Sequence, residues 1–171
     1  LSPKDYKRYK ITASGISPRI VPGTRGFAFV TNSDEHNEFG FSDESSENRI
    51  AQVEKRMRKY DDLAKKIPNP KVYGEKSAKT TLVGWGSTKG VILEAQKLLK
   101  EKGIKTNFLH LNRINPFPSR FVSDFLKSRK NIYMIEQNST AQGAGLIREK
   151  TGVVIKNKIL KYDGRPFFPE E

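Results

Sequence analysis

The second half of the chain alternates short apolar runs with segments that have the periodicity of amphipathic helices. Strands are expected at 80–86, 104–111 and 131–137, with a possible last strand at 153–155. Helices are expected at 87–103, 117–130 and 141–152. Strand–helix–strand repetition with apolar strands predicts a mostly parallel sheet joined by right-handed crossovers. Helices are expected to cover both faces of such a sheet, because its strands are buried on both sides.

The residues before this alternation are organised differently. Residues 1–30 are rich in proline and glycine, which predicts extended chain and turns, with one short strand at 26–31. We therefore expect two parts, a connecting segment at 1–75 with short strands and a long helix, and an α/β domain at 76–171.

The clearest periodic pattern in the connecting segment predicts an amphipathic helix over residues 43–67. Ser42 is the expected N-cap, and Pro68 and Pro70 end the helix. Apolar residues spaced by three and four form one stripe, which favours packing against a neighbouring chain or another domain. The stripe contains Ile50, Val53, Met57, Tyr60, Ala64 and Ile67. Met57 and Tyr60 lie at its centre and are the interface candidates.

Two loops at the expected carboxyl ends of strands are candidate ligand or partner sites, because parallel sheets bind ligands there. The first, GWGSTKG, offers Gly84, Gly86, Ser87 and Thr88 to a phosphate at a helix N-terminus. Its spacing matches neither the dinucleotide fingerprint nor Walker A, and a tight turn explains the glycines equally well. In the second loop, the polar residues Glu136, Gln137 and Asn138 precede a helix that Ser139 or Thr140 is expected to cap.

The stretch TNSDEHNEFG at residues 31–40 gathers Asp34, Glu35, His36 and Glu38. A metal site would need a histidine pair or a second set of ligands close by, and an acid–base site would need a substrate next to it. The pattern favours a polar turn in which Asp34 caps backbone N–H groups and His36 and Glu38 bond chain or partner. The other histidine, His110, ends a strand and is expected to be packed. We assign no catalytic residue and no metal ligand.

The composition limits the functions that are open to the chain. The absence of cysteine excludes disulfides, zinc fingers and cysteine-ligated iron–sulfur clusters within these residues. No apolar run approaches ~18 residues, which argues against a membrane span. We expect a soluble cytoplasmic protein and, because the sequence does not begin with methionine, a piece of a longer chain.

The net charge of +13 arises mainly in residues 76–171, where lysine and arginine exceed aspartate and glutamate by 10. A basic surface can bind nucleic acid or a phosphorylated ligand, so a free-standing basic binding module is the alternative function. Most of the lysines lie singly on polar helix faces, and no zinc-finger, RNP or KH motif supports nucleic-acid binding.

Taken together, the order of motifs resembles that of the C-terminal part of the alpha subunit of 2-oxoacid:ferredoxin oxidoreductases, nearest to the 2-oxoglutarate type. The motifs, in order, are YKRYKIT, GISPR, PGT, TNSDEHNEFG, VEKRMRK, GWGSTKGVILEA, HLNRINPFP, EQNSTAQGAGLIREKTG and KILKYDGRPFFPEE. The resemblance implies a three-layer α/β/α sandwich similar to the C-terminal domain of transketolase, preceded by an extended segment and a long amphipathic helix.

The same resemblance implies an enzyme that uses thiamine diphosphate, magnesium and iron–sulfur clusters to convert a 2-oxoacid and coenzyme A to acyl-CoA while reducing ferredoxin. The substrate motif YPITP of the family is absent from this sequence. The magnesium motif belongs to the beta subunit, and the cluster cysteines belong to other subunits. The chain is therefore expected to bind no cofactor, to be inactive alone, and to contribute structure and an interface to a hetero-oligomer with the beta subunit.

Overall fold

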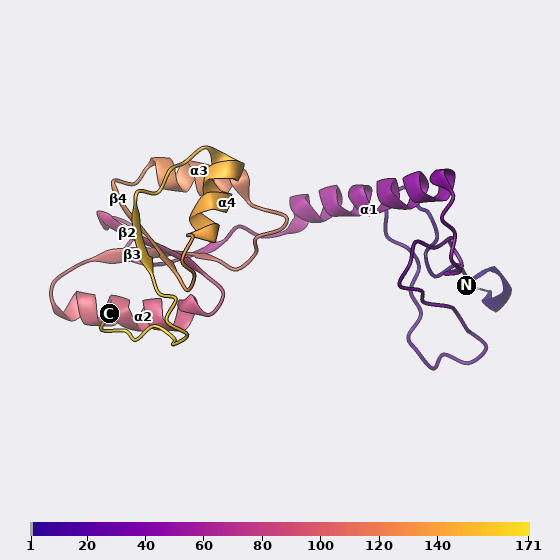
Figure 1. Ribbon diagram of the computed structural model, residues 1–171, viewed down its shortest axis with the longest axis horizontal. Helices are drawn as coiled ribbons and strands as arrows, with labels where there is room; N and C mark the ends of the chain where they lie inside the picture. The colour runs from indigo at the N-terminus through magenta and orange to yellow at the C-terminus, as the bar shows by residue number, and fades with distance from the viewer. Residues whose placement is uncertain (1) are drawn as a thin grey trace. The chain divides into compact units, whose positions relative to one another are not determined.

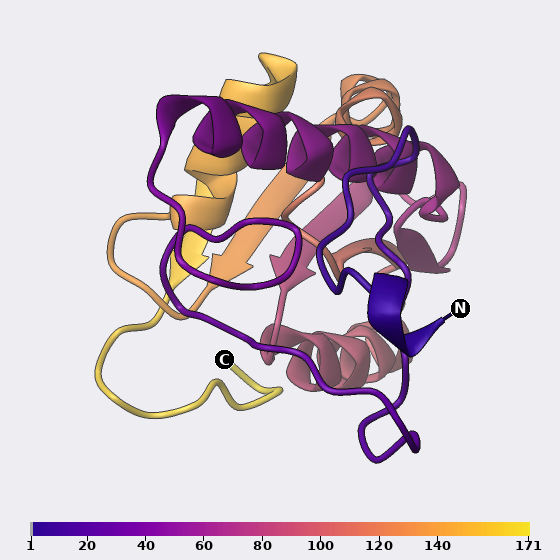
Figure 2. The same ribbon diagram turned by 90° about the vertical axis from the view of Figure 1, so that its right-hand side faces the viewer.

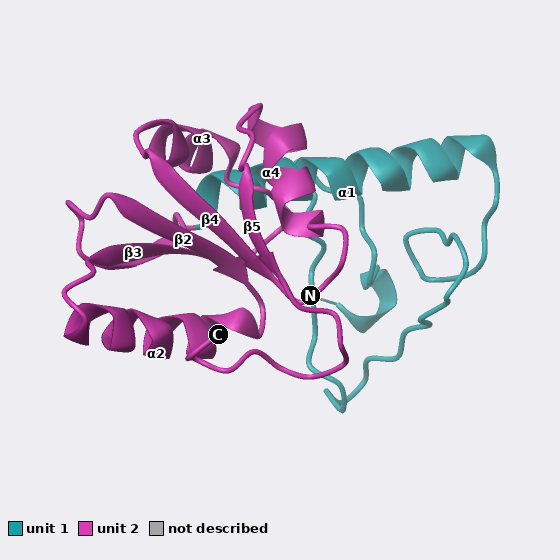
Figure 3. Ribbon diagram, turned by 60° about the vertical axis from the view of Figure 1, so that its left-hand side comes forward, with its two compact units in different colours: residues 1–67 teal, residues 68–171 magenta. Residues whose placement is uncertain are grey.

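The structure is a computed structural model that describes residues 2–171. The chain forms two compact units, which divide between Ile67 and Pro68 (Figure 3). The division falls eight residues before residue 75, where the sequence suggested a boundary, because the strand β1 (Lys71–Gly74) pairs with the sheet of the second unit.

The second unit is built on a five-stranded sheet. After β1, its strands are β2 (Thr80–Trp85), β3 (Thr106–Leu111), β4 (Asn131–Glu136) and β5 (Asn157–Leu160). The strand order is β1-β3-β2-β4-β5, with β1 antiparallel to β3 and the remaining pairs parallel. The predicted α/β fold with a mostly parallel sheet is confirmed.

Helices cover both faces of the sheet. In Figure 1, α2 (Thr88–Glu101) lies on one side, and α3 (Ser119–Lys127) and α4 (Gln142–Thr151) lie on the other. Successive strand residues point to opposite faces, so Val83 packs in the cluster under α3 and α4 whereas Leu82 packs with α2. The fold is the three-layer α/β/α sandwich that the resemblance implies.

Two strand predictions in this unit need correction. The last strand begins at Asn157 rather than at 153–155, and the buried side chain of Ile155 fills the core before the strand starts. The pairing register explains the shift, since Asn157 is the residue that lies opposite Tyr133 of β4. β1 was not predicted, because its four residues have no apolar run and depend on β3 for their hydrogen bonds.

The connections of the sheet change direction between β2 and β4. From β2 the chain passes through α2 to β3, and from β4 it passes through α4 to β5, on the opposite side of the sheet. β2 and β4 are neighbouring strands, and the loops that follow them therefore lead away in opposite directions. Such a switch point leaves a crevice at the carboxyl edge of the sheet.

The first unit contains one long helix, α1 (Ser46–Lys66), and one 3-10 turn, η1 (Pro3–Asp5), and its remaining described residues form turns and irregular chain (Figure 2). The strand predicted at 26–31 is wrong. Phe27 and Phe29 pack edge-on against the ring of Tyr6 at 5.5 and 5.9 Å. Within the described part of the unit, the one β-bridge joins His36 and Ser42.

The predicted helix at 43–67 is present, but it begins three residues later. Ser45, and not Ser42, is the N-cap and accepts a hydrogen bond from the N–H of Asn48 at 3.4 Å. The carboxylate of Asp43 accepts bonds from both the N–H and the Oγ–H of Ser45, at 3.1 and 2.7 Å. Asp43 therefore holds the cap residue and does not enter the first turn.

The side of α1 that is buried is its polar side. Gln52 and Lys55 are 0% and 5% exposed, whereas Ile50, Met57 and Leu63 are 59%, 52% and 47% exposed. Of the predicted apolar stripe, Ile50, Met57 and Ala64 are thus exposed, whereas Val53, Tyr60 and Ile67 are half-buried. No helix in the described residues is long and apolar enough to span a membrane.

Candidate functional site

A hollow of about 170 Å³ lies at the switch point, between the loops that follow β2 and β4. It contains most of the loop residues that the sequence singled out, together with Trp85 and Gln142, which it did not. The lining residues are Trp85, Gly86, Ser87, Thr88, Gln137, Asn138 and Gln142. We call this hollow the crevice.

The fully buried carboxylate of Glu136 organises one wall of the crevice. It accepts hydrogen bonds from Trp85 Nε1 at 3.1 Å, from Asn138 Nδ2 at 2.8 Å, and from the N–H groups of Gly143 and Ala144 at 2.8 and 3.0 Å. The last two donors belong to the first turn of α4, where the helix dipole favours negative charge. The N-terminus of α4 is thus satisfied by a carboxylate of the chain itself.

The loop between β4 and α4 is held by Asn138. Its Oδ1 accepts from the N–H groups of Thr140 and Gln142 at 3.2 and 3.1 Å. The prediction that Ser139 or Thr140 caps the helix is wrong, because the N-cap position is taken by Ala141 in a left-handed conformation. Asn138 supplies the side-chain acceptor that a serine or threonine cap would otherwise provide.

Polar contacts across the crevice join its two loops. Ser87 Oγ donates to Gln137 Oε1 at 3.2 Å, and Gln137 Nε2 donates to the carbonyl oxygen of Arg165 at 3.2 Å. The side chains of Ser87 and Gln137 are therefore engaged with the chain itself. The structure brings these residues together as the sequence suggested, but the ligand role remains a prediction.

The glycine-rich segment from the end of β2 to the start of α2 has a packing function that explains Gly84 and Thr88. A Cβ on Gly84 would lie 2.5 Å from Ile92 Cδ1 and 2.7 Å from Thr88 Oγ1, so a side chain would push α2 away from β2. Thr88 Oγ1 donates to the carbonyl oxygen of Trp85 at 2.8 Å and closes the turn. Phosphate binding by Gly84, Gly86, Ser87 and Thr88 also stays a prediction.

His110 lies at the carboxyl end of β3 in a row of rings. Its ring centroid is 5.7 Å from that of Phe108 and 6.4 Å from that of Tyr73, and Lys89 Nζ lies 5.5 Å from the Tyr73 centroid. Burial, followed by the charge of Lys89, lowers the pKa of His110. The histidine is therefore a largely neutral, packed side chain near neutral pH.

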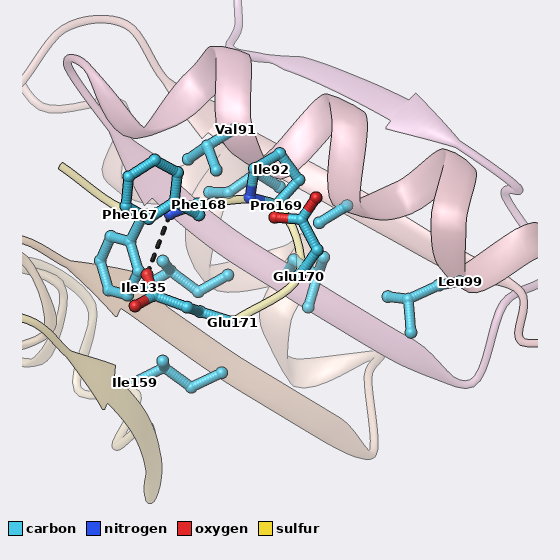
Figure 4. Close-up of a pocket in the computed structure, with 12 residues that line it drawn as sticks. Val91, Ile92, Leu99, Ile135, Ile159, Phe167, Phe168, Pro169, Glu170 and Glu171 are labelled. Carbon is cyan, nitrogen blue, oxygen red and sulfur yellow. Dashed lines mark hydrogen bonds between the residues drawn. The ribbon is translucent and has the colours of Figure 1, made fainter.

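The C-terminal residues close an apolar hollow of about 240 Å³ against α2 and the sheet (Figure 4). Phe167 packs with the core cluster that contains Ile92. The N–H of Phe168 donates to Glu171 Oε2 at 2.9 Å, and Glu171 also forms an ion pair with Lys161. Residues of the chain itself thus fold back over this hollow.

The acidic loop of the first unit is fixed by ion pairs, and Glu35 is its anchor. The side chain of Glu35 is 9% exposed, and its Oε2 lies 2.8 Å from both Arg49 Nη1 and Arg56 Nη2. The hydrogen bond from Arg56, acting against burial, lowers the pKa of Glu35 to about 2. Glu35 was not among the residues predicted to have a special role.

Glu38 and His36 bond the chain itself. Glu38 accepts from Lys7 Nζ at 2.6 Å and from the N–H of Ile11 at 2.8 Å. Burial raises the pKa of Glu38, but these two bonds outweigh it and the pKa is lowered. The ring of His36 lies 3.8 Å from that of Tyr9, and its Nδ1 contacts the carbonyl oxygen of Asn37 at 3.1 Å.

The turn at the start of this loop is formed by Asn32 and not by Asp34. Asn32 Oδ1 accepts from the N–H of Asp34 at 3.0 Å, whereas the side chain of Asp34 is exposed. Residues 2–171 contain no group of three or more histidine, cysteine, aspartate or glutamate side chains that could hold a metal ion. That the loop binds no metal remains a prediction.

Replacing Glu35 by glutamine is expected to lower the free energy of unfolding of the first unit at pH 7 by about 1–2 kcal/mol, with allowance for solvent screening of the exposed guanidinium groups. The lowered pKa means that the stabilisation is complete above pH 4.5 and is lost as the pH falls towards 2. Far-UV circular dichroism, to which α1 contributes the longest helix, should therefore show weaker acid destabilisation of the variant over this range. The exposed Glu47→Gln is the matched control, and an equal effect of both substitutions would contradict the account.

The fold and the crevice define an α/β domain of the doubly wound type. Residues 78–170, more than half of the chain, match the family described as pyruvate:ferredoxin oxidoreductase core domain II, and the chain belongs to this family. The resemblance that the motif order indicated is thereby confirmed.

Characterised relatives are alpha subunits of 2-oxoacid:ferredoxin oxidoreductases. The chain is 35% identical to subunit alpha of 2-oxoacid:ferredoxin oxidoreductase 2 of Aeropyrum pernix, over 99% of this chain and 26% of the relative. It is 36% identical to subunit alpha of the 2-oxoacid:ferredoxin oxidoreductase of Saccharolobus solfataricus, over 98% of this chain and 27% of the relative. The chain thus spans about a quarter of the length of these relatives.

A solved structure is also similar. The 2-oxoglutarate:ferredoxin oxidoreductase of Magnetococcus marinus, determined with 2-oxoglutarate, coenzyme A and succinyl-CoA bound, matches 96% of this chain with a TM-score of 0.75 and 31% identity. The match covers 29% of that chain. Family and fold are therefore shown by sequence and by structure.

Proposed function

We propose that this chain is the C-terminal part of the alpha subunit of a 2-oxoacid:ferredoxin oxidoreductase. The observation that carries the proposal is the identity of about a third to alpha subunits over nearly the whole chain. The complete enzyme oxidatively decarboxylates a 2-oxoacid to the acyl-CoA and reduces ferredoxin. The similarity to the Magnetococcus marinus enzyme supports 2-oxoglutarate as the substrate.

The role of these residues in the enzyme is structural and interface-forming. The family implies thiamine diphosphate and iron–sulfur clusters, and the donor groups of this chain do not fit a cysteine-ligated cluster. The sequence has no cysteine to ligate a cluster. In the part of the chain that is described, no three or more histidine, aspartate or glutamate side chains gather as a group that could hold a metal ion. We therefore place the cofactors on other parts of the enzyme.

The partner of this chain is the beta subunit, and the assembly is a cytoplasmic hetero-oligomer. The apolar stripe of α1, in which Met57 is exposed and Tyr60 is half-buried, is the proposed contact surface. Residues 68–171 form the transketolase-like domain, and residues 1–67 form the segment that connects it to the rest of the subunit. Asp34, His36 and Glu38, with Gln137 and Asn138 of the crevice, are secondary candidates for contacts within the assembly, whereas Glu136 is fully buried and holds the loop.

The test of the function is an activity measurement on the assembled enzyme. A complex isolated through an affinity tag on this chain should reduce ferredoxin when 2-oxoglutarate and coenzyme A are both present. Pyruvate and 2-oxoisovalerate are the control substrates, because they distinguish the 2-oxoglutarate type from other members of the family. Turnover with pyruvate alone would overturn the substrate assignment.

A further inference from the structure

A basic pocket of about 340 Å³ lies within the first unit, between α1 and the turns that precede it. Its volume falls at the low end of the ~300–1,000 Å³ that is usual for small-molecule sites. No aspartate or glutamate lines it among the described residues. Its cationic lining residues are Arg8, Arg19, Lys55, Arg56 and Lys59.

The pocket is a built feature and not a loose gap between loops. Gly15 has φ +72°, and a Cβ there would lie 2.4 Å from the carbonyl oxygen of Lys55, so the turn rests directly on α1. Lys55 is 5% exposed, and its Nζ donates to the carbonyl oxygen of Tyr9 at 2.7 Å and to Ser17 Oγ at 3.1 Å. These bonds use two of the three N–H donors of the ammonium group.

Gln52 gives the pocket an unsatisfied polar group. Its side chain lines the pocket and is fully buried, yet neither Nε2 nor Oε1 has a hydrogen-bond partner among residues 2–171. Buried polar atoms in proteins are almost always paired, so an unpaired amide indicates a missing partner. α1 also buries Gln52 and Lys55 while leaving Ile50 and Met57 exposed, which is the reverse of what apolar packing favours.

Electrostatics of the pocket favour an anion as that partner. Burial, then the charges of Lys59 and Arg56, lower the pKa of Lys55. The carboxylate of Glu35 is shared by Arg49 and Arg56, each at 2.8 Å, so the pocket keeps a net positive charge to which Arg8, Arg19, Lys55 and Lys59 contribute. A phosphate monoester carries a charge of about −1.5 to −2 and three strong acceptor oxygens, whereas a carboxylate carries −1.

We infer that this pocket binds the phosphate group of a small phosphate-bearing molecule. The Nε2 donor of Gln52 and the third donor of Lys55 bond phosphate oxygens, and Arg19 and Lys59 at the pocket supply further charge. The Oε1 atom of Gln52 accepts a hydrogen bond from a hydroxyl or amide group of the same molecule. The site is separate from the crevice and does not depend on the proposed enzymatic function.

Isothermal titration calorimetry of the 171-residue chain with pyrophosphate, at constant ionic strength, tests the inference. The wild-type chain should bind one equivalent. Gln52→Met, which keeps the size of the side chain, should weaken binding about tenfold, as expected for loss of one bond to a charged group. Lys59→Ala should weaken it by a similar factor. Lys65→Ala removes a charge from an exposed position of the same helix outside the pocket and should leave binding unchanged.

Succinate and inorganic phosphate are the comparison ligands. Weaker binding of succinate than of inorganic phosphate supports the assignment to phosphate, and equal binding overturns it. The absence of pyrophosphate binding, or equal losses in Gln52→Met and Lys65→Ala, overturns the site. The Gln52→Met chain could also melt at a higher temperature and still bind pyrophosphate like wild type. That result would show that the amide has no part in anion binding, and it would overturn the proposed site.

Discussion

Replacing Glu136 by alanine is expected to lower the free energy of unfolding of residues 68–171 by about 3–5 kcal/mol, because several buried donors lose their acceptor at once. The carboxylate is fully buried and accepts four hydrogen bonds, from Trp85, Asn138, Gly143 and Ala144. The substitution leaves those buried donors without an acceptor and removes the negative charge at the start of α4. Urea unfolding followed by the fluorescence of Trp85, the single tryptophan, measures the change.

Two variants control this experiment. Glu136→Gln keeps the size of the side chain and one acceptor. Its free energy of unfolding should therefore fall less, by about 1.5–3 kcal/mol, which is the contribution of hydrogen bonds to a charged group. Glu149→Ala lies on an exposed position of α4 and should change stability by about 0.5 kcal/mol or less. A loss for Glu136→Ala no larger than that of Glu149→Ala would show that the carboxylate does not organise the crevice.

Replacing Met57 by aspartate is expected to disrupt assembly with the rest of the enzyme while the chain itself stays folded. Met57 is 52% exposed at the centre of the apolar stripe, so its side chain contributes little to the first unit. At an interface, the new carboxylate would be buried without a partner, which typically weakens association by several kcal/mol. Native mass spectrometry measures the fraction assembled, and far-UV circular dichroism measures folding.

Met57→Leu and Lys65→Ala are the matched controls for that variant. The first preserves an apolar side chain of similar volume, and the second makes the same change of one charge unit at an exposed position of the same helix. Both should assemble like wild type. If Met57→Asp unfolds the isolated chain, the stripe is internal core, and if it assembles normally, the stripe is no interface.

The sheet and its helices could be predicted from the sequence because their signal is local. Apolar runs such as 131–137 are strands in the structure, and the neighbouring residues Leu82 and Val83 face opposite layers as the pleat requires. Pairing depends on distant residues, so β1 and the true start of β5 were missed. The strand expected at 26–31 failed for the same reason, since its apolar side chains pack on Tyr6 and not in a sheet.

The helix α1 shows the limit of periodicity. The spacing of apolar residues predicts that a helix forms, but it does not specify which face the surrounding chain covers. Here the turn around Gly15 covers the polar side with Gln52 and Lys55, and the stripe that includes Met57 remains exposed. The basic pocket could therefore not be inferred from the sequence.

The candidate site was found in part. Glu136, Gln137 and Asn138 were singled out because they follow an apolar strand, and the structure places all three at the switch point. The structural role of Glu136 could not be predicted, because its partner Trp85 is brought close only by the pairing of β2 and β4. A glutamate at the end of an otherwise apolar strand, followed within a few residues by a helix, is the sequence signal that could have indicated it.

The proposal that this chain is a non-catalytic part of a 2-oxoacid:ferredoxin oxidoreductase is tested most directly by measuring ferredoxin reduction. The chain alone is compared with the complex isolated through an affinity tag on the chain, and each is supplied with 2-oxoglutarate, coenzyme A and thiamine diphosphate. We expect turnover by the complex and none by the chain, because the chain lacks cluster-ligating cysteines and a group of metal-binding side chains in its described residues. Turnover by the chain alone, or a complex that forms without any 2-oxoacid-dependent reduction of ferredoxin, would contradict it.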